Sequence, residues 1–271
     1  MAPSKQARPL STSQAAALLN NQASRPAGQP NGRAELRTGF FGIDGLDDIL
    51  PGGITYDTQI MTEGDTGIGK SVLAAQFLYE GLMVGDTCIY IACDEPPSLM
   101  RQNMNNFRLG TESHERAGKL VFVDAYARGR SKEEHFIEEP DNFDEFFLYE
   151  KRVIEAAGSG PVRLMVDSLS TIMATAETPE LIAFNSNRLR YLRARNVLTL
   201  DTVVSGVLEE RAMNGLRHAY PMIVYMRYSS IEGMTQRYIQ LGKLKSGMFQ
   251  ATQHLFSIDP RTGIIVQKTR T

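Results

Sequence analysis

The residues with the clearest chemical purpose form one short segment, Gly64-Asp65-Thr66-Gly67-Ile68-Gly69-Lys70-Ser71. The segment matches G-x-x-x-x-G-K-[ST] at every fixed position, which is the pattern of a phosphate-binding P-loop. Glycines let successive backbone N–H groups point at a polyanion, and the lysine neutralises the β- and γ-phosphates. We therefore expect Lys70 to act on phosphate and the Ser71 hydroxyl to hold Mg²⁺.

The surroundings of this motif are those that its mechanism needs. An apolar, strand-like run over 58–61 precedes the loop, and residues 72–78 are good helix formers. The N-terminus of such a helix directs its dipole at the phosphates. The nucleotide-binding residues predicted from this pattern are Gly64, Asp65, Thr66, Gly67, Ile68, Gly69, Lys70, Ser71 and Val72.

A second apolar run ends in a carboxylate, as a Walker B strand does. Residues 162–166 are strand-like and Asp167 follows them. Parallel strands that neighbour the P-loop strand bring their carboxyl ends beside the phosphates, where Asp167 can hold Mg²⁺ or a metal-bound water. The alternative is that Asp167 caps the next turn, since Ser168 and Ser170 follow. The P-loop in the same chain favours the metal role.

A third run, over 90–93, ends in two adjacent carboxylates. Glu95 is the candidate general base or water-orienting residue, and Asp94 is its support or substitute. Adjacent carboxylates in one site raise the pKa of one of them, which suits a base. Capping of the helix that begins at Pro96 and Pro97 is an alternative role, and the two roles are compatible.

Positive charge for the transition state of phosphoryl transfer could come from Arg237, Lys243 and Lys245. The two lysines alternate with Leu244 on a strand-like segment and are expected to share one face. Taken alone, these residues resemble solvated cations on an edge strand. An arginine finger supplied by a neighbouring subunit is the more specific hypothesis.

Composition limits the classes of protein to which the chain can belong. Its 271 residues are 42% hydrophobic and carry a formal net charge of only -2, so no global field attracts nucleic acid or a membrane. No apolar run reaches the roughly 20 residues of a membrane span, and the N-terminus lacks a signal-peptide core. We therefore expect a cytoplasmic protein. Cys88 and Cys93 are expected on opposite faces of one strand, buried and unpaired.

The pattern of elements predicts a disordered tail over 1–33 and one α/β domain over 34–271. Apolar strand-like runs alternate with helical patterns, which implies right-handed crossovers and a mostly parallel sheet flanked by helices. The last runs, near 236–245, 254–258 and 264–268, are expected to be antiparallel additions at one end of the sheet. The other strands are expected near 58–62, 87–93, 119–124, 162–167, 198–204 and 221–228, and helices at 70–84, 96–107, 142–157 and 180–195.

These motifs together resemble the KaiC family of RecA-like P-loop ATPases over roughly residues 36–268. The glycine-rich segment 38–54 resembles the family's N-terminal motif, and the P-loop, Asp94-Glu95 and Asp167-Ser168 follow in the family's order. Residues 243–247 (Lys-Leu-Lys-Ser-Gly) resemble the late K-x-[RK] strand of the family, which reaches a nucleotide held by the adjacent subunit.

The resemblance implies a homohexameric ring that binds ATP and Mg²⁺ at subunit interfaces and hydrolyses ATP slowly. It implies that Glu95 is the catalytic acid residue and that Arg237, Lys243 and Lys245 act in trans. The circadian clock protein of the family has two glutamates where this chain has Asp94 and Glu95, so which acid acts stays open. That protein also has two tandem domains, whereas we expect one here, without the second domain that carries autophosphorylation sites, so a circadian role is not expected. A regulatory or signalling switch with an unidentified protein partner is therefore expected.

Two alternative functions remain open at this point: a DNA-associated, recombinase-like ATPase and a nucleotide-sensing scaffold of a larger machine. For the first, Arg188, Arg190, Arg193 and Arg195 form a basic helix, but a solvated helix face is the favoured interpretation. The segment 209–220, expected to be a loop lining the pore of a ring, is not strongly basic and lacks clustered aromatics for stacking bases. The acidic segment 128–150 is expected to be a solvated loop, with partner docking as the alternative.

Overall fold

A computed structural model describes residues 37–50, 52–231, 233–245 and 251–267. The expected tail over 1–33 lies outside the described residues, as do Ser246 and Gly247 of the late motif. The strands are β1 (Thr38–Gly39), β2 (Ile54–Thr55), β3 (Gln59–Gly64), β4 (Thr87–Ala92), β5 (Leu120–Asp124), β6 (Val162–Asp167), β7 (Val197–Val204), β8 (Met222–Ile231), β9 (Met234–Leu244), β10 (Gln253–Asp259) and β11 (Gly263–Val266). The helices are η1 (Asp47–Ile49), α2 (Lys70–Met83), α3 (Pro97–Asn106), α4 (Glu112–Arg116), α5 (Phe143–Ala156), α6 (Leu169–Met173), α7 (Thr178–Ala194) and α8 (Glu210–Ala219).

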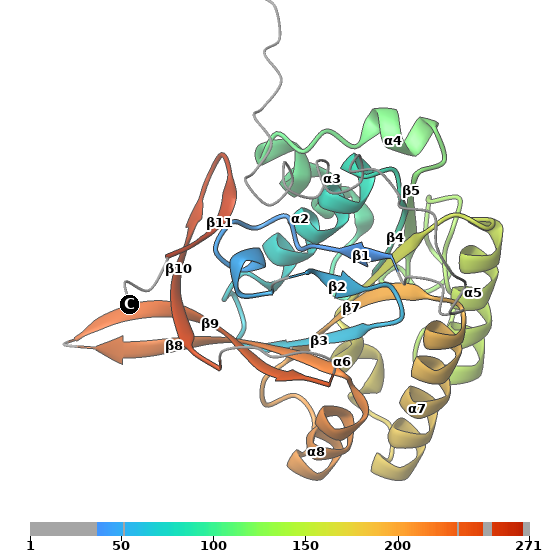
Figure 1. Cartoon of the computed structure of the whole chain (residues 1–271). Coiled ribbons are helices and arrows are strands. Elements are labelled where there is room, and N and C mark those ends of the chain that lie inside the picture. The colour runs from blue at the N-terminus through green and yellow to red at the C-terminus, as the bar shows by residue number, and fades with distance from the viewer. Residues whose placement is uncertain (1–36, 51, 232, 246–250, 268–271) are drawn as a thin grey trace, which may run out of the picture.

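Within the described residues, nine strands form one sheet in the order β11-β10-β9-β8-β3-β7-β6-β4-β5 (Figure 1). The strands from β8 to β5 in this order are parallel, whereas β9, β10 and β11 are added antiparallel. The prediction of a mostly parallel α/β sheet with antiparallel C-terminal strands is confirmed. The P-loop strand β3 lies between β8 and β7, so its immediate neighbour is not the strand of Asp167. That strand, β6, is separated from β3 by β7, which corrects the expected adjacency.

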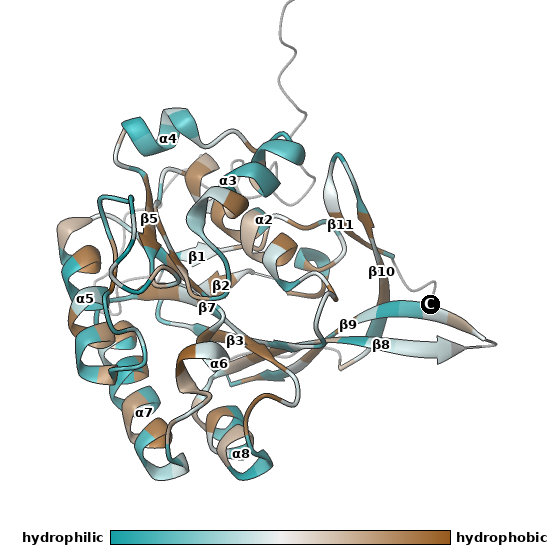
Figure 2. Ribbon diagram, turned by 180° about the vertical axis from the view of Figure 1, so that it is seen from behind, coloured by the Kyte–Doolittle hydropathy of each residue, from teal (hydrophilic) through white to brown (hydrophobic). Residues whose placement is uncertain are grey.

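Helices cover both faces of the sheet, because successive side chains of a buried strand point to opposite sides. Cys88 and Tyr90 of β4 pack into the core on the side of α2 and α3, whereas Ile89 and Cys93 pack into the core on the side of α5, α7 and α8. Each buried leucine or isoleucine stabilises such a core by about 1.5–3 kcal/mol. The hydrophobic colour of most of β5 contrasts with the hydrophilic colour of α4, which lies at the surface (Figure 2). Cys88 and Cys93 are buried and free, as predicted.

The segment before β3 is anchored by one carboxylate. Asp47 accepts backbone N–H bonds of 2.8–2.9 Å from Phe41, Gly42 and Ile43. Gly42 has φ 76°, and a Cβ atom there would lie 2.8 Å from Cβ of Glu80, so the turn requires glycine. This turn fixes the approach of the chain to the first central strand.

Three sequence predictions about polar segments are wrong, two of them only in part. Arg190, Arg193 and Arg195 are exposed, as expected for a solvated helix face. Arg188 does not lie on a solvated face: its side chain is fully buried and forms ion pairs of 2.6 Å with Glu150 and Asp201. Residues 210–219 form the helix α8 instead of a loop, because Ala212, Met213 and Leu216 recur at helical spacing and are buried. The acidic segment is only partly a loop, since α5 begins at Phe143 and buries Glu150.

Candidate nucleotide site

The P-loop joins the end of β3 to the start of α2. Gly69 directly precedes α2 with φ 120°, and a Cβ atom there would lie 2.7 Å from Cδ1 of Ile258. Glycine is therefore required both by the backbone conformation and by the close approach of β10. Thr66 and Gly67 at the loop tip are exposed, whereas Ile68 is buried in the core beneath it. The loop backbone is thus held from below while its tip faces solvent.

Lys70 begins α2 and lies across the loop. Its Nζ donates hydrogen bonds to the carbonyl oxygens of Gly64 at 3.0 Å and Asp65 at 2.9 Å. Only 8% of the residue is exposed, and this burial lowers the pKa of Lys70, opposed by the nearby charges of Asp167 and Asp94. The lysine, the Walker B acid and one acid of the pair are therefore close enough to interact, although they come from three distant segments.

Asp167 is the last residue of β6, as the apolar run before it predicted, although β6 is not next to β3. One carboxylate oxygen accepts a bond of 3.0 Å from the Tyr90 hydroxyl, and the other accepts one of 2.6 Å from Thr202. Burial raises the pKa of Asp167, while hydrogen bonds from Thr202, Ser71 and Tyr90 oppose that rise. Because each carboxylate oxygen has two lone pairs, Asp167 keeps acceptor capacity beyond these bonds.

The acid pair follows β4, and its two members differ. Asp94 accepts hydrogen bonds from Ser168, at 3.1 Å, and from Thr171. Glu95 is exposed and has no hydrogen bond or ion pair among the described residues. A cavity of about 340 Å³ opens beside Asp94 and Thr171, which leaves this end of the sheet accessible to water. The structure brings Asp94 to Lys70 and Asp167, whereas Glu95 is exposed and is not among the residues that line the cavity.

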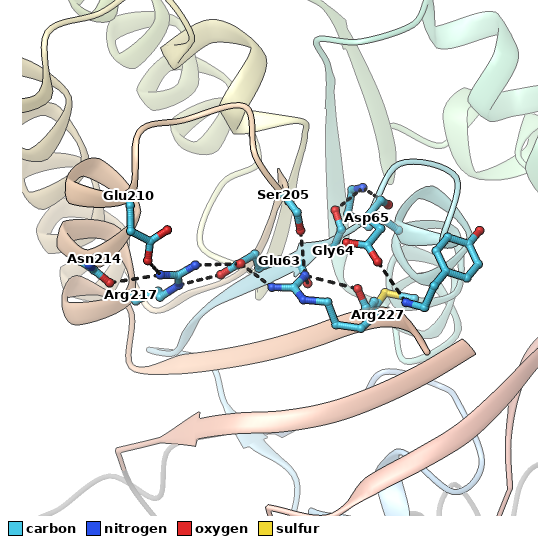
Figure 3. Close-up of polar contacts among 11 residues, drawn as sticks. Glu63, Gly64, Asp65, Ser205, Glu210, Asn214, Arg217 and Arg227 are labelled. Atoms are coloured by element: carbon cyan, nitrogen blue, oxygen red, sulfur yellow. Dashed lines mark hydrogen bonds and ion pairs between the residues drawn. The ribbon is translucent and has the colours of Figure 1, made fainter. Parts of the chain in front are cut away.

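An ion-pair network around one buried carboxylate adjoins the loop (Figure 3). Glu63, whose side chain is 3% exposed, is the residue before Gly64 and pairs with both Arg217 and Arg227. Arg227 also donates to the carbonyl oxygen of Glu63 at 3.1 Å and to the Ser205 hydroxyl at 2.8 Å. Arg227 therefore links the carboxyl ends of β3 and β7 to the middle of β8.

The three cations predicted to act in trans do not share one environment. Lys243 is partly buried, and its Nζ donates to the carbonyl oxygens of Arg217 at 2.7 Å and His218 at 2.9 Å. Lys245 is exposed and lies beyond the end of β9. Arg237 stacks on the Tyr228 ring, with 5.6 Å between the guanidinium carbon and the ring centroid. The Tyr228 hydroxyl donates to the carbonyl of Gly67 at 2.9 Å, so this cation lies near the P-loop of its own chain.

Comparison with known proteins identifies the family to which the chain belongs. The model of the family described as "ATPase: KaiC" matches residues 40–271. The chain belongs to the KaiC family. It is 29% identical to UPF0273 proteins of Saccharolobus solfataricus and Pyrococcus furiosus, over 83% of this chain and 81% and 92% of theirs. A crystal structure of a KaiC-like protein from Pyrococcus horikoshii has the same fold, with a TM-score of 0.69, 24% identity, and coverage of 86% of this chain and 99% of that chain.

Membership of the KaiC family agrees with the resemblance inferred from the motifs. Among the described residues, no helix has both the length and the apolar character needed to cross a membrane. No cluster of three or more His, Cys, Asp or Glu side chains is arranged to hold a metal in the described part of the chain.

Sequence reasoning missed several residues of the site. Tyr90 and Thr202, which hold Asp167, look like ordinary strand residues and carry no motif. Glu63 offered a clue: a carboxylate directly before the P-loop, in a strand whose other residues are buried, must have a cationic partner. The identity of that partner could not be read from the sequence, because Arg217 and Arg227 lie more than 150 positions away along the chain.

Proposed function

We propose that this KaiC-family protein binds ATP with Mg²⁺ at the P-loop, hydrolyses it slowly and assembles into a homohexameric ring that acts as a regulatory or signalling switch. The observation that carries the proposal is the convergence of Lys70, Ser71, Asp167 and Asp94 at one edge of the sheet. Hydrolysis needs a phosphate cradle, a metal anchor, a group that orients water, and positive charge. Candidates for each lie at this edge or, for the positive charge, on the neighbouring β9 strand.

The donor set fits Mg²⁺, which prefers hard oxygen ligands. Ser71 would supply a hydroxyl oxygen, and Asp167 a carboxylate oxygen either directly or through water. When bound, the ion would supply positive charge against the charge that develops on the phosphate oxygens. Tyr90 and Thr202 hold the Asp167 carboxylate in one orientation, so it does not have to be ordered when the ligand arrives.

The chain's own side chains divide the remaining work. Lys70 binds the β- and γ-phosphates, and the N-terminus of α2 adds its dipole to that attraction. Glu95 orients the attacking water and accepts its proton, since it is exposed and free to turn. Asp94, held by Ser168 and Thr171, supports that water from the rim of the cavity. Transition-state charge is neutralised in trans by Arg237, Lys243 and Lys245 of an adjacent subunit.

Two measurements test the proposal. Lys70→Ala should abolish binding of a fluorescent ATP analogue and phosphate release, because the ammonium that neutralises the phosphates is gone. Native binding by Lys70→Ala would contradict the site. Sedimentation of the native protein with ATP and Mg²⁺ should show a hexamer, and a persistent monomer would contradict the ring.

A recombinase-like role on DNA is less well supported. The sequence feature in its favour is a helix with four arginines. Arg188 of that helix is buried, however, and forms ion pairs with Glu150 and Asp201. The segment expected to line a pore forms the helix α8, in which Arg217 pairs with Glu63 and Glu210. Binding of single-stranded DNA at low salt, declining steeply as salt rises, would restore this alternative.

A further inference from the structure

Arg217 of α8 takes part in two separate contacts, one through its side chain (Figure 3) and one through its backbone carbonyl. Its side chain donates to the Glu63 carboxylate through Nε at 2.8 Å and Nη2 at 2.9 Å. The remaining nitrogen, Nη1, donates to Glu210 at 2.6 Å and Asn214 at 3.1 Å within the same helix. The guanidinium is therefore fixed to α8 at one end and to the residue before the P-loop at the other.

The backbone of the same residue contacts a different element. The carbonyl oxygens of Arg217 and His218, at the C-terminal end of α8, accept hydrogen bonds from Nζ of Lys243. These carbonyls have no partner inside the helix, and the negative end of the helix dipole favours a cation there. The last turn of α8 thus holds Lys243 on β9 while its side chain holds the strand of the P-loop.

We propose that Glu63, Arg217 and α8 couple the P-loop of one subunit to Lys243, the cation that this subunit offers to the next. Binding of ATP in one site then changes the activity of the adjacent site. This inference rests on the proposed ring with cations acting in trans, and it names the regulation of that same site. Arg217 is a positioning residue in this scheme, since it touches neither nucleotide.

We call the chain of contacts from Glu63 through Arg217 and α8 to Lys243 the relay. Each end of the relay has two competing sets of contacts, as coupling requires. At the P-loop, a phosphate competes with the carbonyls of Gly64 and Asp65 for Lys70, so ATP alters the loop that begins directly after Glu63. At the other end, two of the three donors of Lys243 are engaged by α8, and they have to be redirected before the ammonium serves a neighbouring phosphate. A shift of α8 links the two events.

The decisive experiment measures phosphate release against ATP concentration for the hexamer. We expect a Hill coefficient above 1 for the native protein and a value of about 1 for Arg217→Gln, because independent sites give no cooperativity. Glu63 keeps Arg227 as an ionic partner in that variant. The matched control is Arg195→Gln, which breaks the exposed pair with Glu155 and should leave the Hill coefficient at the native value.

A second variant approaches the relay from its other end. Glu63→Gln keeps Arg217 but removes the charge it binds, and it should also bring the Hill coefficient to about 1. A hexamer whose Hill coefficient is the same in the native protein and in both variants overturns the relay, while the ring stands. A native hexamer without cooperativity overturns it as well. A chain that stays monomeric with ATP and Mg²⁺ overturns the ring itself, so the two failures are distinguishable.

Discussion

At the scale of single residues, the two acids after β4 are held differently. Asp94 accepts hydrogen bonds from Ser168 and Thr171, whereas Glu95 has no hydrogen-bond partner in the described part of the chain. A general base must turn toward its water and take a proton. We expect Glu95→Gln to bind ATP as the native protein does and to lower kcat by roughly 10²–10⁴-fold. Nucleotide titration and steady-state phosphate release measure the two effects separately.

The control for this variant is Glu134→Gln, an exposed glutamate outside the site. It should leave kcat at the native value, because surface changes of this kind rarely alter activity or stability. If Glu95→Gln retains full turnover, the base is not Glu95. Loss of turnover in Asp94→Asn would then move that role to Asp94.

The ion pairs of Glu63 should make the free energy of unfolding depend on pH in the acid range. Burial favours the neutral form, but the bonds and charges of Arg217 and Arg227 hold the pKa of Glu63 below its ordinary value of 4.5. Such a group contributes stability that is present above the unfolded pKa and is lost as pH falls through the folded pKa. Unfolding by urea should therefore become easier below pH 4.5 in the native protein and change less in Glu63→Gln. An identical acid response in the two proteins would contradict the ion-pair assignment.

At the scale of elements, one buried arginine joins α7, α5 and β7. Arg188 pairs with Glu150 and Asp201, and the Tyr220 hydroxyl donates to the same Asp201 at 2.6 Å. Arg188→Ala leaves two carboxylates buried without their cation, which costs about 3–5 kcal/mol. We expect the melting temperature to fall by roughly 10 °C, as measured by circular dichroism.

Arg190 supplies the comparison on the same helix, because its side chain is exposed. Arg190→Ala should change stability by no more than about 0.5 kcal/mol. Equal effects of the two substitutions would show that the buried pairs of Arg188 do not stabilise the packing of α7 on the sheet.

The elements also show how far the sequence determines the fold. The P-loop and its flanking strand and helix could be predicted because each depends on residues close together in the chain. The burial of Arg188 could not, since Glu150 and Asp201 belong to other elements and become neighbours only when the chain folds. Asp201 within the apolar run of β7 was the available clue, because a carboxylate there needs a partner. The helix α8 was missed because its charged outer residues obscured a buried stripe at helical spacing.

At the scale of the whole molecule, the central question is whether the site is completed by a second subunit. In a closed ring the contact between subunits is head-to-tail, so each subunit offers its P-loop to one neighbour and its β9 cations to the other. Lys70→Ala removes the phosphate anchor, and Lys243→Ala removes the cation. Each variant alone should therefore show no turnover, and sedimentation checks that each still assembles.

Mixing these two inactive variants discriminates between action in trans and in cis. In a mixed ring, the intact P-loop of a Lys243→Ala subunit can meet the intact Lys243 of a Lys70→Ala neighbour. Random assembly of equal amounts restores about a quarter of the sites, so we expect turnover to return at no more than about a quarter of the native rate. If Lys243 serves its own P-loop, every subunit in the mixture lacks one of the two groups and no activity returns. Mixing Lys70→Ala with Lys70→Met supplies the control, because those rings contain no intact P-loop at any ratio.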